Sequence, residues 1–206
     1  MKNILLIRHG ESEWNKLNLF TGFKNVELSE LGKEEANKAG QNFKNLGLRF
    51  DIVFTSELKR AQDTAKIILE NLEQWNQLNS ENKIIKNINL NERDYGDLTG
   101  LNKKETAEKF GDDQVHKWRR GYSDQPPNGE SLEDVVNRVK IYFDKEIMPA
   151  INKSENNNIL IAAHGNSLRA LLIVMNIYSS DNINSVELST GVPIHILYEN
   201  EIFSIK

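Results

Sequence analysis

Short apolar runs alternate along the chain with segments in which apolar residues recur every three or four positions. The apolar runs predict buried strands at 3–8, 50–56, 83–92 and 157–166. The helical spacing predicts helices over 29–47, 61–72, 102–110, 115–120, 131–149 and 167–175. Near the end of the sequence, two strand-like stretches at 193–199 and 202–206 flank a polar turn and predict a β-hairpin.

The order of these elements predicts the fold class. Helices that connect successive strands are typical of parallel crossovers, and a closing hairpin adds an antiparallel strand. We therefore expect an α/β fold, a three-layer sandwich with a mostly parallel central sheet and an antiparallel edge strand. Ser131, followed three positions later by Asp134, is typical of a helix N-cap, and it predicts the start of the long helix that ends near Pro149.

Composition and charge narrow the class of protein. The 206 residues can bury a sizeable core without an evident linker or repeat, so we expect one domain over 1–206. A net charge of −4 offers no basic field for nucleic acid or an anionic membrane, and no apolar stretch reaches the roughly 18 residues that span a bilayer. The N-terminal apolar run is too short for a signal peptide, so a cytoplasmic location is expected. The lack of cysteine excludes disulfides and thiolate chemistry.

Two predicted strands end alike, one in "IRHG" and the other in "AAHG". Ligands bind beyond the carboxyl ends of the strands in open α/β sheets, so His9 and His164 are expected to face one pocket. Arg8 precedes the first histidine, and Arg60 falls near the start of the helix after the second strand. Arginine binds phosphoryl oxygens and a neutral imidazole attacks phosphorus, so the cluster suits phosphoryl transfer. Taken singly, each of these residues has a simpler explanation. A histidine at a strand end can merely bond nearby backbone, and a lone arginine can lie on a solvated helix face.

A carboxylate would supply the proton transfers that this chemistry needs. Glu92 comes at the end of the third predicted strand, in "LNERDYGDLTGLNK". Like charge from a neighbouring phosphate would raise the pKa of this carboxyl, which suits a general acid and base near neutral pH. The alternative is an ordinary surface ion pair with Arg93.

These motifs have a family counterpart. The chain resembles the cofactor-dependent phosphoglycerate mutases of the histidine phosphatase superfamily over nearly its whole length. The matching stretches are "RHGESEWN", "FTGF", "LSELG", "TSELKRAQDTA", "LNERDYGDLTGLNK", "WRRGY", "PPNGESL", "AAHGNSLRAL" and "TGVPI". The RHG stretch alone indicates only the superfamily, which includes many phosphatases. "GLNK", "WRRGY" and "HGNSLRAL", in this order, are more specific to the mutases.

The resemblance implies a role for each matching position. His9 becomes the phosphorylated nucleophile, Glu92 the general acid and base, and Arg8, Arg60 and His164 bind the transferred phosphoryl group. The other implied substrate-binding residues are Gly10, Glu11, Ser12, Asn15, Thr21, Gly22, Tyr95, Lys103, Arg119, Arg120, Gly165 and Asn166. The groups implied to hold the glycerate carboxylate and the second phosphate are Tyr95, Lys103, Arg119 and Arg120. Residues 93–130 are expected to form a helical cap segment over the site.

The implied activity is the interconversion of 3-phosphoglycerate and 2-phosphoglycerate in glycolysis and gluconeogenesis, through a phosphohistidine intermediate. The enzyme would be an isomerase, an intramolecular phosphotransferase whose small-molecule partners are the two phosphoglycerates. The implied cofactor is 2,3-bisphosphoglycerate, which primes the histidine. No metal is expected, because the histidines and carboxylates show no ligand spacing such as HExxH.

Two other functions remain as alternatives: a phosphatase on the same scaffold, and a catalytically silent binding module. The basic residues of 103–120 argue against the first, and the intact cluster around His9 argues against the second. Three features depart from the family pattern: Asp94 where many members have histidine, a short 127–130 connection, and no longer tail after the hairpin. The sequence leaves open the oligomeric state, with a homo-oligomer among the alternatives, and the ratio of mutase to phosphatase activity.

Overall fold

A six-stranded sheet runs through the molecule in the order β3-β2-β4-β1-β5-β6, and the computed structural model describes residues 1–206. The strands are β1 (Lys2–Arg8), β2 (Ile52–Thr55), β3 (Ile84–Lys86), β4 (Asn158–Ala163), β5 (Pro193–Glu199) and β6 (Ile202–Ile205). The first four pair in parallel, whereas β5 runs antiparallel to β1 and β6 antiparallel to β5. The predicted mostly parallel sheet is confirmed, and its antiparallel part is the whole predicted hairpin.

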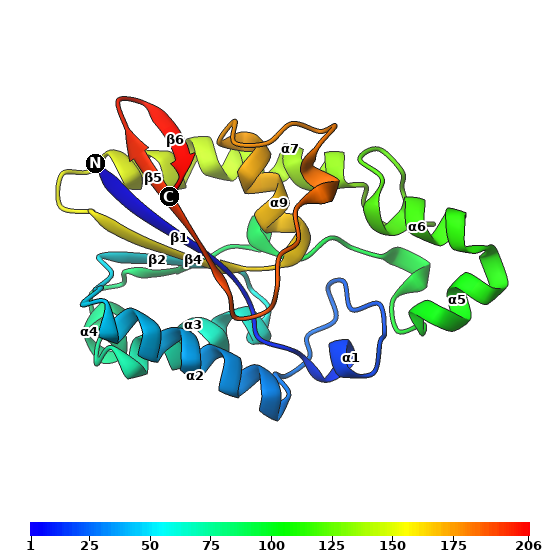
Figure 1. The fold of residues 1–206 in the computed structure, drawn as a ribbon, viewed down its shortest axis with the longest axis horizontal. Helices are drawn as coiled ribbons and strands as arrows, with labels where there is room; N and C mark the ends of the chain where they lie inside the picture. Colours follow the sequence, from blue (N-terminus) through cyan, green and yellow to red (C-terminus); the bar gives the residue numbers. More distant parts are fainter.

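Helices cover both faces of this sheet, which confirms the three layers (Figure 1). One face carries α2 (Glu30–Asn45), α3 (Lys59–Asn71) and α4 (Trp75–Ser80). The other carries α7 (Leu132–Tyr142), α8 (Met148–Asn152) and α9 (Gly165–Val174). The short α1 (Glu13–Lys16), α5 (Lys103–Phe110) and α6 (Asp112–Arg120) lie at one end of the molecule, beyond the sheet.

Strand β1 shows why the central strands are continuous apolar runs. Successive side chains point to opposite faces, so Ile4 and Leu6 join a core cluster of 25 buried residues under α7 and α9. Leu5 and Ile7 join the cluster of 13 on the α2–α3 side. Each such side chain contributes about 1.5–3 kcal/mol when fully buried. A parallel strand that is buried on both faces therefore needs apolar residues at every position.

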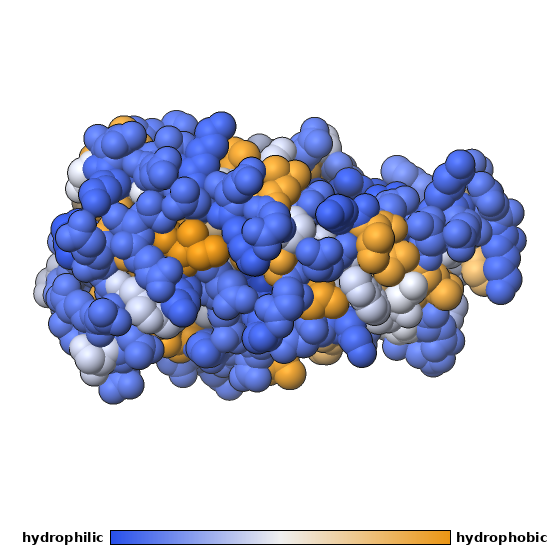
Figure 2. All heavy atoms as spheres, turned by 90° about the horizontal axis from the view of Figure 1, so that it is seen from below, coloured by the Kyte–Doolittle hydropathy of each residue, from blue (hydrophilic) through white to orange (hydrophobic).

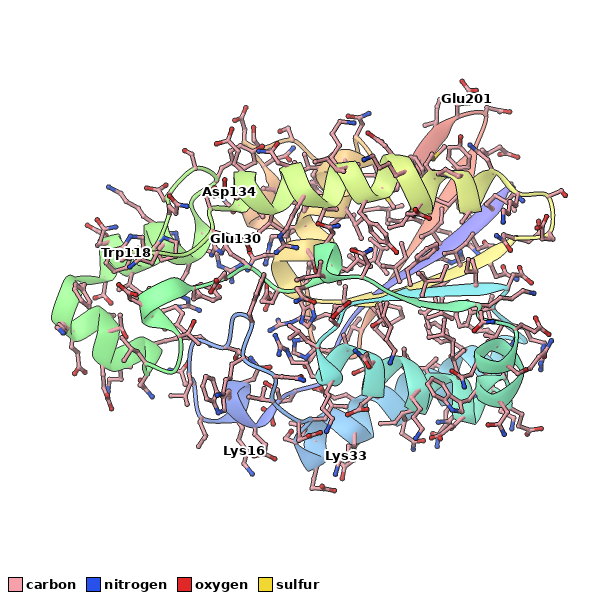
Figure 3. The ribbon with its side chains drawn as sticks, turned by 180° about the vertical axis from the view of Figure 1, so that it is seen from behind. Lys16, Lys33, Trp118, Glu130, Asp134 and Glu201 are labelled. Atoms are coloured by element: carbon pink, nitrogen blue, oxygen red, sulfur yellow. The ribbon has the colours of Figure 1, made fainter.

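The α5–α6 segment is tied to the rest of the chain by a small third cluster. Its buried members are Phe20, from the loop after α1, Leu98 and Val115, and Trp118 packs against them. Figure 3 shows Trp118 at this end of the molecule, with Glu130 and Asp134 where the chain returns to α7. These packing contacts fix the position of α6 beside the carboxyl edge of the sheet.

The predicted strand over 83–92 is wrong beyond Lys86. The side chain of Asn87 accepts a hydrogen bond from the backbone N–H of Asn89, and the chain turns into a 3-10 helix over Ile88–Leu90. Asparagine side chains form such local hydrogen bonds in competition with the hydrogen bonds between β-strands. Two further 3-10 helices, Gly96–Leu98 and Ile183–Ser185, had no counterpart in the predicted elements, and neither did α1 and α4.

The long helix begins as predicted but ends later. Ser131 caps α7 in a reciprocal capping box with Asp134. A π-helical turn over Phe143–Ile147 then leads into α8, which continues to Asn152. Pro149 lies in the first turn of α8, where a missing N–H is tolerated, so it does not end the helix near residue 149 as expected.

No helix is long and apolar enough to cross a lipid bilayer. Figure 2 shows hydrophilic residues over most of one face, with apolar groups in separate patches.

Candidate active site

The register of two neighbouring strands brings the two predicted histidines together. Arg8 of β1 lies opposite Ala163 of β4, and His9 and His164 are the residues that directly follow the two strands. Their rings lie 4.9 Å apart, centroid to centroid, and both side chains are buried. The backbone N–H of His9 donates to the carbonyl of Ala163 at 3.0 Å, which fixes the spacing of the two strand ends.

Two contacts determine which nitrogen of His9 carries the proton. Nδ1 lies 2.6 Å from the carbonyl oxygen of Gly10, which can only accept a hydrogen bond. Nδ1 is therefore protonated, and Nε2 keeps its lone pair. Nε of Arg60 donates to this Nε2 at 3.3 Å. The arrangement presents Nε2 as the nucleophilic atom, at a point that a guanidinium also reaches.

Burial keeps both histidines neutral. It lowers the pKa of His9 well below its usual value, with further lowering by the positive charges of Arg60 and Arg8, against a smaller opposing effect of the Gly10 carbonyl. Burial also lowers the pKa of His164, followed by the charge of Arg60. A neutral imidazole is the form that can attack phosphorus.

Arg60 is held rigidly at the start of α3. Its Nη1 and Nη2 donate to the carbonyls of Lys24 and Gly22, each at 2.9 Å, and burial lowers its pKa to about 10. Arg60 therefore stays charged at neutral pH. It lies at the beginning of a helix, where backbone N–H groups also favour anions.

Several buried polar atoms around the histidines lack a hydrogen-bond partner within the protein. They include Nε of Arg8, Nδ1 of His164 and Oγ1 of Thr21. The Ser56 hydroxyl lies 2.7 Å from Nε2 of His164, and its oxygen already accepts the backbone N–H of Leu58 at 3.1 Å. In the tautomer in which the hydroxyl donates to Nε2, the imidazole proton is on Nδ1. Buried donors without partners are costly, so these atoms fit the oxygens of a phosphoryl group.

Glu92 has one carboxylate oxygen engaged and one left for chemistry. Oε1 accepts the backbone N–H groups of Arg93 at 2.8 Å and Asn166 at 3.1 Å. Burial alone would raise its pKa, but the Arg93 N–H, the charges of Arg8 and Arg60 and the Asn166 bond together hold the pKa below its usual value. The sequence-based expectation of a raised pKa depended on a phosphate, whose negative charge acts in the opposite direction. No ion pair between Glu92 and Arg93 forms, because the contact uses the backbone of Arg93.

The predicted site residues of segment 93–130, Tyr95, Lys103, Arg119 and Arg120, line the same pocket. The lining consists of Arg8, His9, Asn15, Leu19, Thr21, Gly22, Arg60, Glu92, Tyr95, Lys103, Arg119, Arg120, Gly165, Asn166 and Arg169. Burial, together with the charges of Arg119 and Arg8, lowers the pKa of Lys103 to about 8. Five arginines and a lysine therefore surround a space whose lining has a single acid, Glu92. Such an excess of cationic groups calls for a ligand with several negative charges.

Four predicted residues lie outside this lining. His164 is one of them, although its ring lies 4.9 Å from that of His9 and its buried Nδ1 has no partner within the protein. Gly10 packs directly on Gly32 of α2, where a larger residue would meet backbone. The other two, Glu11 and Ser12, bond Ser29 and Asn15 respectively. The geometry gives these last three residues a supporting place, and their contact with substrate stays a prediction.

Sequence reasoning missed two lining residues, Leu19 and Arg169. Arg169 lies in the "HGNSLRAL" stretch, and a lone arginine within an apolar helix was the signal. Its Nη2 donates to the carbonyl of Val186 at 3.0 Å, and Nε has no partner. Burial and the charge of Arg120 lower its pKa to about 10.

No group of three or more histidine, cysteine, aspartate or glutamate side chains is arranged to hold a metal ion. The donors that converge on the pocket are cationic, and they suit an anionic organic cofactor rather than a cation.

Comparison with known proteins gives close relatives. A family model described as histidine phosphatase superfamily (branch 1) matches residues 4–206. A 2,3-bisphosphoglycerate-dependent phosphoglycerate mutase from Parvibaculum lavamentivorans is 52% identical over 200 residues, which cover 97% of this chain and 91% of the relative. The protein of the same description from Bartonella bacilliformis is 52% identical over 198 residues, or 96% and 92% of the two chains.

Solved structures agree on the fold. A mycobacterial glucosyl-3-phosphoglycerate phosphatase superposes with a TM-score of 0.83 at 20% identity, covering 100% of this chain and 98% of the other. An alpha-ribazole phosphatase from Shigella flexneri gives 0.78 at 23% identity, with 99% and 94% covered. At these identities the likeness establishes the architecture alone.

Proposed function

Because the chain belongs to the histidine phosphatase superfamily (branch 1), we propose that it is a 2,3-bisphosphoglycerate-dependent phosphoglycerate mutase, an isomerase of glycolysis and gluconeogenesis. The observation that carries the proposal is a neutral His9, with Nε2 unprotonated and Arg60 beside it, in a pocket that Lys103, Arg119 and Arg120 also line. The relatives named as such mutases support the substrate class. The pathway implies a cytoplasmic location.

Phosphorylation of His9 primes the enzyme, and the same step, with the bound bisphosphate as donor, closes each cycle. Nε2 attacks phosphorus, and the N–P bond forms as the bond between phosphorus and the donor oxygen breaks. The protonated carboxyl of Glu92 gives its proton to that oxygen and becomes a carboxylate. Arg8, Arg60 and Nδ1–H of His164 donate to the phosphoryl oxygens as negative charge shifts among them.

Transfer back to substrate reverses these roles. Glu92, as the carboxylate, takes the proton of the acceptor hydroxyl while the new O–P bond forms and the N–P bond breaks. The low pKa that the protein imposes on Glu92 suits this step. When bound, 2,3-bisphosphoglycerate supplies the phosphoryl group that primes His9.

Isomerisation also requires the doubly phosphorylated species to stay bound while it turns. Lys103, Arg119 and Arg120 add positive charge to the pocket that His9 lines, and they come from the segment 93–130 that we propose acts as a cap. Arg119 and Arg120 come from the last turn of α6, and Lys103 from the first turn of α5. Charge at both ends lets either phosphate occupy either position.

The first experiment measures 2-phosphoglycerate formation from 3-phosphoglycerate, with and without a trace of 2,3-bisphosphoglycerate and EDTA. Turnover should require the bisphosphate and survive the chelator. Loss of activity in EDTA with recovery on adding manganese would contradict the proposal.

A second experiment identifies the intermediate and separates mutase from phosphatase. Incubation with the bisphosphate should give an acid-labile, base-stable adduct that His9→Ala abolishes. Arg119→Ala and Arg120→Ala should lower mutase turnover about ten- to a hundredfold, and hydrolysis of a small phosphate ester much less. Equal loss of both activities would favour a phosphatase.

A further inference from the structure

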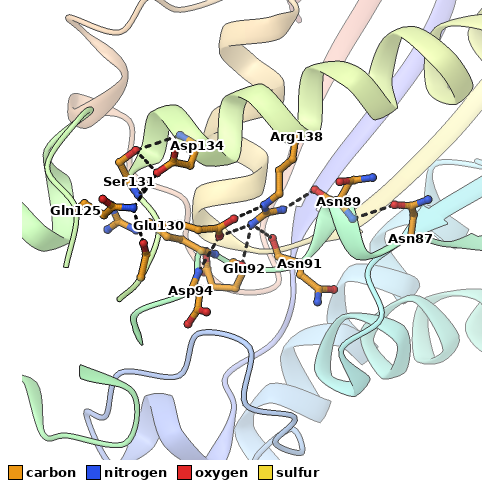
Figure 4. Close-up of polar contacts among 12 residues, drawn as sticks. Asn87, Asn89, Asn91, Glu92, Asp94, Gln125, Glu130, Ser131, Asp134 and Arg138 are labelled. Atoms are coloured by element: carbon orange, nitrogen blue, oxygen red, sulfur yellow. Dashed lines mark hydrogen bonds and ion pairs between the residues drawn. The ribbon is translucent and has the colours of Figure 1, made fainter. Parts of the chain in front are cut away.

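The loop that carries Glu92 is held by hydrogen bonds from Arg138, which lies outside the pocket and has no role in the proposed chemistry. Arg138, on α7, donates from Nη1 to the carbonyl of Asn89 at 2.6 Å and from Nη2 to the carbonyls of Asn91 and Glu92 at 3.1 and 2.9 Å (Figure 4). One planar guanidinium thus binds three carbonyl groups of a four-residue stretch. Because the guanidinium is rigid, displacement of the loop weakens several of these bonds together.

Glu130 binds both Arg138 and the other end of the loop. Its two carboxylate oxygens accept Nε and Nη2 of Arg138 at 2.8 and 2.9 Å, a bidentate pair. Oε2 also accepts the backbone N–H of Asp94, while the N–H of Glu130 donates to the carbonyl of Asp94, both at 2.9 Å. The loop is therefore fixed on both sides of Glu92 by one ion pair.

This ion pair is sheltered from solvent. The side chains of Arg138 and Glu130 are only 16% and 22% exposed, whereas those of Lys140 on the same helix and of Asp144 in the π-helical turn after it are 60% and 53% exposed. Screening by water and salt makes exposed pairs weak, and sheltering retains their strength. The guanidinium also lies 5.7 Å from the ring centre of Phe23, next to pocket residue Gly22.

The contacts inside the pocket do not replace this anchor. The N–H groups of Arg93 and Asn166 orient the Glu92 carboxylate, but Arg93 belongs to the same loop and moves with it. The distance between Oε2 and an oxygen undergoing phosphoryl transfer at His9 depends on where the loop backbone sits. A general acid acts only within hydrogen-bond reach of that oxygen.

We propose that Arg138 and Glu130 are positioning residues for proton transfer by Glu92, an inference that rests on the proposed function. When Nε2 of His9 takes the phosphoryl group, the O–P bond breaks and the proton of Glu92 moves to the leaving oxygen. The ion pair holds Oε2 where this transfer is direct. It touches neither substrate nor phosphoryl group.

The leaving group provides a test that a general loss of structure would not satisfy. Single-turnover phosphorylation of His9 is measured with two saturating donors, 2,3-bisphosphoglycerate and para-nitrophenyl phosphate. The first leaves as an alkoxide and needs a proton, whereas nitrophenolate is stable without one. A misplaced general acid therefore slows the first reaction and spares the second.

The variants are Arg138→Gln, Arg138→Lys and Glu130→Gln, with Lys140→Gln on the same helix as the matched control. Arg138→Gln should slow phosphorylation by the bisphosphate about ten- to a hundredfold and by the aryl ester less than about threefold. Arg138→Lys and Glu130→Gln keep part of the contacts, so their rates of phosphorylation by the bisphosphate should lie between those of Arg138→Gln and the native protein. Lys140→Gln should be phosphorylated at the native rate by both donors. Circular dichroism and thermal melting verify that each variant is folded.

Equal slowing with both donors, or no slowing in any variant of the pair, would overturn the positioning role. If an Arg138 variant does not fold, Glu130→Gln tests the same role through the same ratio of rates. Failure of the native protein to form phosphohistidine with either donor would instead refute the proposed function.

Discussion

Raising the pH from about 7 to about 9 should uncharge Lys103 and remove most of the mutase activity. Burial and the neighbouring charges of Arg119 and Arg8 lower the pKa of this lysine to about 8. The protonated form lies on the acidic side of that value. Binding of an anionic substrate that relies on Lys103 is therefore favoured below about pH 8 and lost above it.

The magnitude follows from the titration curve. With a pKa of about 8, the charged fraction falls from roughly 90% near pH 7 to roughly 10% near pH 9. If the charge is needed, kcat/KM falls by roughly tenfold over this interval. Bound phosphate favours the charged lysine, so kcat should decline at higher pH than kcat/KM does. His9 and His164 stay neutral throughout, because their pKa values lie well below this range.

The assay is the pH profile of kcat/KM for 3-phosphoglycerate, with excess coupling enzymes at every pH. Lys103→Gln should lower kcat/KM about ten- to a hundredfold at neutral pH and flatten the profile toward higher pH. Lys104→Gln, at the neighbouring exposed lysine, should keep the native profile. If kcat/KM of the native protein stays level to about pH 9, or if Lys103→Gln shows the same decline, the loss of activity does not come from deprotonation of Lys103.

Three further substitutions test other parts of the structure. Arg169→Met should raise KM for phosphoglycerate more than it lowers kcat, because Arg169 lines the pocket with an unpartnered Nε; an unchanged KM would show that it does not meet substrate. Gly10→Ala should destabilise the protein by about 1–3 kcal/mol or more in urea unfolding, because its Cβ would meet the backbone of Gly32; an unchanged midpoint contradicts this. Ser131→Ala should lower the free energy of unfolding by about 0.5–2 kcal/mol, because the N-cap of α7 is lost. An unaltered melting curve would contradict this role of Ser131.

Local patterns in the sequence determined most of the elements. The period of apolar residues depends only on backbone geometry, so β1 and α2 appear close to their predicted bounds. Ser131 and Asp134 predicted the start of α7 because a capping box is complete within four residues. The motifs around His9 and His164 likewise indicated phosphoryl chemistry, because arginine binds phosphoryl oxygens and a neutral imidazole can attack phosphorus.

Tertiary structure decided which of these groups meet and in what state. The pairing of β1 with β4 joins residues more than 150 positions apart, and it alone places the two imidazoles 4.9 Å from each other. The proton on Nδ1 of His9 depends on the Gly10 carbonyl, whose direction the sequence does not specify. Burial sets the pKa of Lys103, and the anchoring of Glu92 by Arg138 spans 46 positions. Charge, dielectric environment and distance all arise from packing between remote segments, whereas sequence patterns report neighbours along the chain.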